Sequence, residues 1–143
     1  MPQAAPDDYR LVDGPPSAED YLALRVRAGL TPRRPEQAHA AVGGSWAAVH
    51  VLDERTGATV GMGRVIGDGG WYFHVVDMAV LPEHQRRGLG DAILTALLDR
   101  IRDGAPAGAY VNLLADPPGR KLYERHGFAA TAPRSIGMAR RLD

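Results

Sequence analysis

The middle of the chain alternates between apolar residues and polar or glycine residues, as half-buried β-strands do. Three stretches, 46–52, 59–66 and 71–81, are rich in valine, alanine, glycine and aromatic residues. Short polar or glycine-rich turns, 53–57 and 67–70, separate them. Alternation between turn signals predicts strands, and short connections predict that neighbouring strands run antiparallel. We therefore expect three antiparallel strands in this part of the chain.

Helical spacing predicts two helices before this region and one after it. Ser17 is suited to cap the first helix, which should end near Gly29. Pro35 opens a second short helix that continues through Val42. The third helix, over 88–103, carries an apolar stripe with helical period, formed by Ile93, Leu94, Leu97, Leu98 and Ile101.

Shorter elements are expected at the two ends of the chain. The residue pattern predicts strands over 9–12, 109–115 and 135–142. A last short helix should begin at Asp116 as its N-cap, with prolines in the first turn, and end at Gly127. The order β, α, α, β, β, β, α, β, α and a closing strand predicts an α+β fold with a mixed, mostly antiparallel central sheet flanked by helices.

Length and composition narrow the class of protein. The 143 residues suit one domain over 1–143, in which residues 1–8 are expected to be frayed. Lys+Arg and Asp+Glu both number 17, and this balance argues against a nucleic-acid partner. Cysteine is absent, and the five histidines follow no metal-binding spacing. No apolar stretch nears the roughly 20 residues of a membrane helix, so we expect a cytoplasmic protein without a metal or a membrane partner.

One segment combines glycines and arginines between a predicted strand and a predicted helix. A helix N-terminus presents unpaired N–H groups and a partial positive charge, and glycines let a ligand approach the backbone closely. The arginines add charge and bidentate hydrogen bonding. The segment consists of Gln85, Arg86, Arg87, Gly88, Leu89 and Gly90. It is suited to hold a pyrophosphate, although an Arg-rich turn that merely caps a helix has the same composition. Neither a P-loop nor a Rossmann fingerprint fits, because there is no G-x-x-x-x-G-K-[ST] and Ile93 stands at the third glycine position.

Three motifs in order resemble those of one family. Gln85-x-x-Gly88-x-Gly90 resembles the Q/R-x-x-G-x-G/A signature of the GNAT acetyltransferases. The preceding residues 77–84 look like the fourth strand of that family and its exit. Downstream, Leu122-Tyr123-x-x-x-Gly127-Phe128 is similar to the family's L-Y-x-x-x-G-F motif. The resemblance covers nearly the whole chain and implies acetyl-CoA-dependent N-acetylation of a primary amine.

The resemblance also implies a set of cofactor contacts. In the family the fourth strand carries a bulge and splays from its neighbour, so that the pantetheine arm lies along its edge. This implies contacts by Met78, Ala79 and Val80, whose amides a bulge could aim at the thioester carbonyl. Two positions depart from the family's common N-x-x-A pattern, because Asp116 and Gly119 stand in place of the Asn and the Ala. Asp116 cannot donate a hydrogen bond to pantetheine as an amide would. Lys121 could reach the 3′-phosphate of the cofactor or simply be solvated.

Acyl transfer to an amine needs a proton acceptor and benefits from an acid at the sulfur. The resemblance implies Tyr123 as the acid, although a tyrosine in this motif could also only close the core. His74 is a candidate base, because many relatives place a Glu or His on this strand facing the amine. It could equally be an inert histidine on a half-buried strand. Asp77 is the other candidate for the catalytic site, and it could instead pair with an arginine such as Arg64.

Strand geometry makes a prediction about these side chains. Simple alternation puts His74, Val76 and Met78 on one face of the strand and Asp77 on the other. A bulge in the strand would reset this pattern.

The resemblance places a small-molecule amine between the first two helices and the facing strands, for direct attack in a ternary complex. The residues expected around it are Tyr21, Leu24, Arg27, Leu30, Arg64, Trp71, Tyr72 and His74. The aromatic residues favour an apolar acceptor and the arginines an acidic one, so its identity and the range of acyl groups stay open. Two other functions are considered, a non-catalytic acyl-CoA-binding module and a protein Nα- or Lys-acetyltransferase. The closing strand could pair with its copy in a homodimer, by analogy only.

Overall fold

The computed structural model of the protein describes residues 5–143, which form two compact units that meet in sequence at Leu113 and Leu114. The prediction of a single domain over 1–143 stays a prediction. Of the segment expected to be frayed, residues 1–4 lie outside the described part, and residues 5–8 include a turn. In this turn the Tyr9 N–H donates to the Pro6 carbonyl at 2.9 Å.

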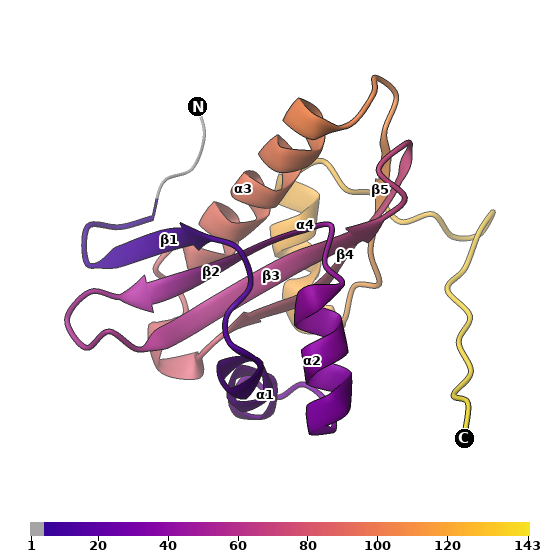
Figure 1. Cartoon of the computed structure of the whole chain (residues 1–143). Coiled ribbons are helices and arrows are strands. Elements are labelled where there is room, and N and C mark those ends of the chain that lie inside the picture. Colours follow the sequence, from indigo (N-terminus) through magenta and orange to yellow (C-terminus); the bar gives the residue numbers. More distant parts are fainter. Residues whose placement is uncertain (1–4) are drawn as a thin grey trace. The chain divides into compact units, whose positions relative to one another are not determined.

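The first unit is built on a five-stranded sheet (Figure 1). Its strands are β1 (Tyr9–Asp13), β2 (Ala47–Asp53), β3 (Thr59–Gly67), β4 (Tyr72–Val80) and β5 (Tyr110–Asn112). They lie side by side in chain order. Neighbours from β1 to β4 pair antiparallel, and β4 and β5 pair parallel. The predicted mixed, mostly antiparallel sheet is therefore confirmed.

Three helices cover the two faces of this sheet. They are α1 (Ala18–Arg27), α2 (Pro35–Gly43) and α3 (Leu89–Gly104), and a short 3-10 helix η1 (Pro82–His84) precedes α3. The helices α1 and α2 lie on one face and α3 on the other (Figure 1). Ser17 caps α1 as predicted, because its hydroxyl accepts the N–H of Asp20 at 3.1 Å.

One part of the core lies between α3 and the sheet, and another lies under α1 and α2, where Tyr21, Leu24 and Ala38 are buried. The apolar stripe of α3 is buried almost completely at Ile93, Leu94, Leu97 and Ile101, where at most 3% of each residue is exposed. The helix approaches β3 closely at Gly63. A Cβ on this glycine would lie 2.7 Å from both Ile93 Cγ2 and Met78 Sδ. Burial of the stripe fixes the position of α3, and with it the position of the loop that leads into the helix.

The strand β4 contains a bulge opposite β3. The register shifts between the pairs Met62–Ala79 and Arg64–Val76, and Asp77 has a φ of 58°. The extra residue reverses the alternation, so that Asp77 faces α1 while the Met78 sulfur lies toward α3. The prediction by simple alternation, which placed Met78 on the face of His74, is therefore wrong, and the bulge implied by the resemblance is the reason.

The strand β5 is shorter than the predicted stretch 109–115. It pairs only with Tyr72–His74, so the six residues of β4 that follow have no partner in it. One edge of β4 from Val75 to Val80 is thus left without a strand partner on the β5 side.

The second unit contains one turn of 3-10 helix and one short helix. These are η2 (Pro117–Gly119) and α4 (Arg120–Arg125). Gly127 ends the helix as predicted, with a φ of 88°, and the Phe128 N–H donates to the Tyr123 carbonyl at 3.1 Å. Asp116 is the N-cap residue of η2, as predicted, but its carboxylate makes no capping hydrogen bond. Its backbone carbonyl instead accepts the N–H of Gly119.

The strand predicted over 135–142 does not form. These residues follow a turn and have no regular secondary structure. Ile136 and Met138 alternate as strand residues do, but they are 68% and 88% exposed. Alternation alone does not make a strand, because a strand needs a neighbour for its backbone hydrogen bonds. The homodimer considered on the basis of this strand stays a prediction.

Candidate functional site

The loop from Gln85 to Gly90 joins η1 to α3 and is held at both ends. At its start, the Gln85 side-chain amide donates to the Val80 carbonyl at the end of β4 at 3.0 Å. At its end, Leu89 is 1% exposed and anchors the first turn of α3 in the core. Two residues in between adopt left-handed backbone conformations, Arg86 with a φ of 63° and Gly88 with a φ of 79°. The loop is therefore a shaped turn tied to the unpaired edge of β4.

The N-terminus of α3 is open toward a ligand. Gly88 occupies the N-cap position and, within the described residues, no side chain caps the helix. A Cβ at Gly88 would meet no atom within 4 Å, so the space beside the helix end is free. Arg86 and Arg87 are both exposed next to it. Unpaired N–H groups, a positive helix end and two exposed guanidinium groups are suited to bind a pyrophosphate.

The predicted contacts at the end of β4 lie beside this loop. Ala79 is buried, and Met78 and Val80 are half-buried. Because these side chains are wholly or partly buried, a ligand would contact the backbone of these residues. That backbone lies along the part of β4 that has no partner in β5. An extended acyl-pantetheine arm can hydrogen-bond to such an edge in the manner of an added strand. Contact of these residues and of the loop with a cofactor stays a prediction.

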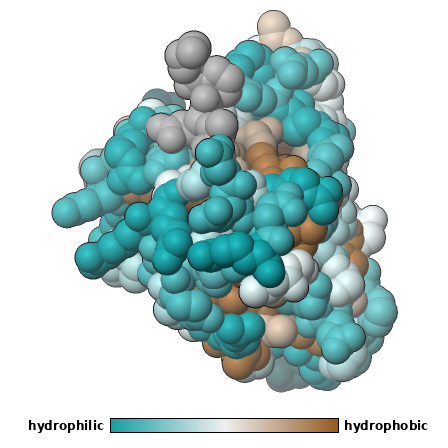
Figure 2. Space-filling view, turned by 90° about the vertical axis from the view of Figure 1, so that its left-hand side faces the viewer, coloured by the Kyte–Doolittle hydropathy of each residue, from teal (hydrophilic) through white to brown (hydrophobic). Residues whose placement is uncertain are grey.

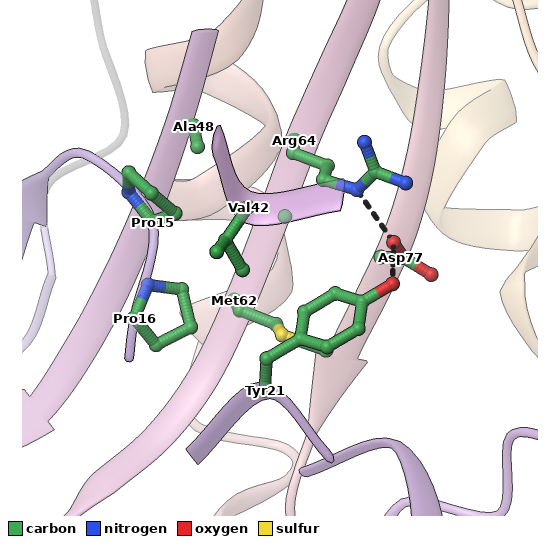
Figure 3. Close-up of a pocket in the computed structure, with 9 residues that line it drawn as sticks. Pro15, Pro16, Tyr21, Val42, Ala48, Met62, Arg64 and Asp77 are labelled. Carbon is green, nitrogen blue, oxygen red and sulfur yellow. Dashed lines mark hydrogen bonds and ion pairs between the residues drawn. The ribbon is translucent and has the colours of Figure 1, made fainter. Parts of the chain in front are cut away.

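Asp77 is the centre of a buried ionic network on the face of α1 (Figure 3). Its carboxylate accepts the Tyr21 hydroxyl at 2.6 Å and Arg64 Nε at 2.6 Å, and it also pairs with Arg25. Arg25 is held in turn by two hydrogen bonds to the Thr31 carbonyl, at 2.9 and 2.6 Å. Only 7% of Asp77 and 7% of Arg25 is exposed. The pairing of Asp77 with Arg64 was one of the two predicted alternatives.

The network keeps Asp77 ionised. Burial alone would raise the pKa of Asp77, but hydrogen bonds from Tyr21 and Arg64 and the charges of Arg64 and Arg25 hold it below its usual value. Burial and the Asp77 carboxylate together raise the pKa of Tyr21, which therefore stays a donor. A carboxylate that accepts hydrogen bonds from three side chains is a poor proton acceptor. These contacts favour the pairing role of Asp77 over a role as the catalytic base, which no contact supports.

The sequence did not point to Arg25. Tyr21 was expected near the acceptor, and Arg25 follows it by four residues on the same helix, so both side chains reach the sheet from one face. That four-residue spacing was the signal in the sequence from which Arg25 could have been found.

A cavity of about 10 Å³ lies beside the network and has room for about one water molecule (Figure 3). It is lined by Tyr21, Met62, Arg64 and Asp77 among others.

His74 lies on β4, three residues before the bulge. It is half-buried, and its Nδ1 lies 2.7 Å from Asn112 Oδ1 on β5. Asn112 in turn donates through Nδ2 to the Tyr72 hydroxyl at 2.6 Å. His74 pairs with Ile66 across β3, two residues from Arg64, so His74 and Arg64 share the α1 and α2 face of the sheet. Sequence reasoning missed Asn112, because the parallel register of β4 and β5 cannot be read locally.

The remaining predicted residues belong to the second unit. Burial, and the charge of Asp116, raise the pKa of the Tyr123 phenol, which therefore keeps its proton at neutral pH. Gly119 lies under the Tyr123 ring, and a Cβ there would come within 2.9 Å of Tyr123 Cε2. An alanine at position 119, as in the family's common pattern, would therefore clash with the Tyr123 ring where it lies in this structure. Lys121 is exposed, which is compatible with contact with the 3′-phosphate and also with simple solvation.

Residues 5–143 contain neither a metal-binding cluster nor a membrane-spanning helix. No group of three or more histidine or acidic side chains could hold a metal ion in this part of the chain. None of its helices is both long and apolar enough to cross a membrane.

Comparison with known proteins links the chain to one family. The model described as an acetyltransferase (GNAT) domain matches residues 45–130. A solved protein of unknown function from meticillin-resistant Staphylococcus aureus, described as a probable acetyltransferase, is 37% identical, with a TM-score of 0.88 over 94% of this chain and 99% of that chain. None of the curated proteins matches the chain.

Two more distant structures share the fold. A GNAT family acetyltransferase from Streptococcus pneumoniae is 24% identical, with a TM-score of 0.76 over 94% of this chain and 98% of that chain. Glucosamine-6-phosphate N-acetyltransferase from Arabidopsis thaliana is 18% identical, with a TM-score of 0.70 over 94% of this chain and 99% of that chain.

Proposed function

This chain belongs to the GNAT acetyltransferases, and we propose that it transfers an acetyl group from acetyl-CoA to the primary amine of a small molecule, by direct attack in a ternary complex. The observation that carries the proposal is the open N-terminus of α3, which the Gln85–Val80 hydrogen bond ties to the unpaired edge of β4. A pyrophosphate and an extended arm need these two features side by side.

The loop and the strand edge bind different parts of acetyl-CoA. Backbone N–H groups from Gln85 to Gly90 and the guanidinium groups of Arg86 and Arg87 bind the pyrophosphate. The backbone of Met78, Ala79 and Val80 orients the acyl arm, and its amides polarise the thioester carbonyl. Acetyl-CoA supplies the thioester, whose C–S bond breaks as the new C–N bond forms.

Two side chains of the protein move protons in this proposal. His74 accepts the proton that the amine nitrogen loses as it attacks. Tyr123 gives its phenolic proton, or a hydrogen bond, to the departing sulfur, which keeps the electron pair of the broken bond. Burial raises the pKa of Tyr123, so the phenol is protonated at neutral pH and can donate a hydrogen bond to the sulfur. The proton balance closes when His74 releases its proton and Tyr123 regains one through solvent.

Thiol-release assays over a panel of amines test the proposal, with mass spectrometry of the product. Release of CoA together with one acetylated amine class is the expected result. Binding of acetyl-CoA without turnover on amino acids, amino sugars, polyamines or aryl amines would contradict the enzyme proposal and favour an acyl-CoA-binding module. Acetylation of peptide N-termini or lysines alone would contradict the small-molecule acceptor.

Replacement of the candidate base should separate chemistry from binding. In His74→Gln we expect kcat to fall on the order of 100-fold, the usual contribution of a positioned base, with unchanged affinity for acetyl-CoA. A histidine accepts a proton only when it is neutral, so the wild-type rate should rise with pH on the acid side. The variant should lose that limb of the pH–rate profile. His39→Gln, on the exposed surface of α2, is the matched control, and an intact limb in His74→Gln would exclude His74 as the base.

Loss of the phenolic hydroxyl should have a different signature. Tyr123→Phe is expected to lower kcat on the order of 100-fold while titration calorimetry shows the same affinity for acetyl-CoA. The ring packs against Phe128 at 6.1 Å between centroids, and phenylalanine preserves that contact. Tyr110→Phe, at a 44% exposed tyrosine of β5, is the control. Undiminished turnover of Tyr123→Phe would remove Tyr123 from the mechanism.

A further inference from the structure

Three polar side chains form a hydrogen-bonded chain where β4 and β5 run parallel. His74 Nδ1 lies 2.7 Å from Asn112 Oδ1, and Asn112 Nδ2 lies 2.6 Å from the Tyr72 hydroxyl. Both distances are short enough for a hydrogen bond. Neither bond was expected from the sequence, and the acetyl-transfer proposal above does not use them.

The register of the two strands brings these side chains together. Tyr72 pairs with Tyr110 and His74 with Asn112, so the side chains of Tyr72, His74 and Asn112 lie on one face. The pair of His74 and Asn112 is the last before β4 and β5 diverge. The imidazole therefore lies at the point where the unpaired edge of β4 begins, and Asn112 holds it from the side of β5.

The chemistry of the amide determines which ring nitrogen carries the proton. An amide oxygen has no proton to give, so a hydrogen bond between Asn112 Oδ1 and His74 Nδ1 requires the hydrogen to be on Nδ1. In the neutral ring the lone pair is then on Nε2. We propose that Asn112 is a positioning residue, which fixes His74 in the tautomer whose Nε2 accepts the proton of the amine. The inference rests on the proposed role of His74 as the base.

The Asn112 amide lies between the Tyr72 hydroxyl and the His74 ring. In the structure Nδ2 donates to the Tyr72 hydroxyl oxygen and Oδ1 faces His74 Nδ1. The Tyr72 hydroxyl can donate as well as accept, so the state of the imidazole, and not Tyr72, distinguishes this orientation from the opposite one. The opposite orientation of the amide would place an N–H against Nδ1 and force the ring proton onto Nε2. A ring of that kind could donate from Nε2 but could not accept a proton there. The two orientations of the amide thus differ in which nitrogen of the neutral His74 ring carries the hydrogen, and this can be measured.

Few other charged groups face this ring. On the same face of the sheet, β3 contributes Arg64, and β4 contributes Asp77 beyond the bulge. These two are paired with each other, and Asp77 also pairs with Arg25 of α1. From β5 the neighbours are Asn112 and Tyr110, and α3 packs on the opposite face. Asn112 is the side chain that hydrogen-bonds to His74 in the described part of the chain.

The tautomer can be read without any substrate. In protein labelled with 15N at histidine, two-bond 15N–1H correlation spectra at a pH where the ring is neutral should show His74 with hydrogen on Nδ1, assigned with His74→Gln. His50 is an internal reference, because its Nδ1 bonds the Gly14 carbonyl at 2.9 Å and must also carry hydrogen. In Asn112→Leu the His74 pattern should change and the His50 pattern should stay. Hydrogen on Nε2 of His74 in the wild-type protein would overturn the inference, whatever the activity.

Kinetics of two Asn112 variants give the second readout. Asn112→Leu should lower kcat about tenfold or more, with unchanged affinity for acetyl-CoA, because the ring loses its preferred tautomer. Asn112→Asp keeps an acceptor for Nδ1–H and should recover most of kcat, while its carboxylate moves the acid limb of the pH–rate profile to higher pH. Equal activity of Asn112→Leu and wild type would overturn the inference. If no amine is acetylated at all, the proposed function fails, and the spectra still decide the tautomer.

Discussion

Gly88→Glu should reduce the affinity for acetyl-CoA on the order of 100-fold or more. The new carboxylate would stand at the open N-terminus of α3, where the pyrophosphate is proposed to bind. Loss of even two charge-assisted hydrogen bonds costs about 3 kcal/mol, and each 1.4 kcal/mol is a factor of ten in affinity. Like-charge repulsion adds to this loss. Isothermal titration of the purified variant with acetyl-CoA measures the effect.

The chain offers a matched control for this substitution. Gly57 has a φ of 75° against 79° for Gly88, and a Cβ would meet no atom within 4 Å at either position. Gly57→Glu therefore introduces the same backbone strain and the same charge in the turn between β2 and β3. Hydrophilic side chains cover most of the face toward which that turn points, so a further carboxylate is tolerated there (Figure 2). Equal affinity of both variants and wild type would refute the proposed loop function.

Asp77→Asn should destabilise the fold by about 3–5 kcal/mol, the usual cost of breaking a buried ion pair from one side. The amide leaves Arg25 and Arg64 without their shared anion, and both are largely buried. Urea unfolding compares the variant with Glu83→Gln, which breaks an ion pair with Arg27 whose side chains are 57% and 54% exposed. The control should cost less than about 1 kcal/mol.

The stability that Asp77 contributes should depend on pH with a definite sign. The pKa of Asp77 is lowered in the folded protein, so its contribution is complete above the unfolded value of about 3.9. It is lost as the pH falls through the lower folded value. The difference between wild type and Asp77→Asn should therefore be constant near neutral pH and shrink below about pH 4. If Asp77→Asn instead unfolds at the same urea concentration as wild type but loses the pH dependence of the acetyl-transfer rate, Asp77 is a base.

Most of the first unit could be predicted because its elements are specified locally. Alternation marks β2, β3 and β4, the Ser17 cap marks the start of α1, and an apolar stripe marks α3. Each of these signals lies within the element that it predicts. The closing strand over 135–142 was wrong, because a strand also needs a partner that its own residues do not specify.

The candidate site divides in the same way. The loop Gln85–Gly90 was predictable, since glycines and arginines between a strand and a helix are adjacent in sequence. The hydrogen bond between His74 and Asn112 joins residues 38 positions apart, and the bond between Tyr21 and Asp77 spans 56. Asp77 faces α1 only because of a bulge, which no local pattern of β4 reveals. Contacts of this kind depend on register, and register is a property of the folded sheet.

Isothermal titration of the wild-type protein with acetyl-CoA tests the central claim most directly, because it asks only whether the loop and strand edge form a cofactor site. The account predicts saturable binding at one site per chain, weakened on the order of 100-fold or more in Gly88→Glu and unchanged in Gly57→Glu. Absence of saturable binding to the folded wild-type protein would contradict the assignment of the acetyl-CoA site to this loop.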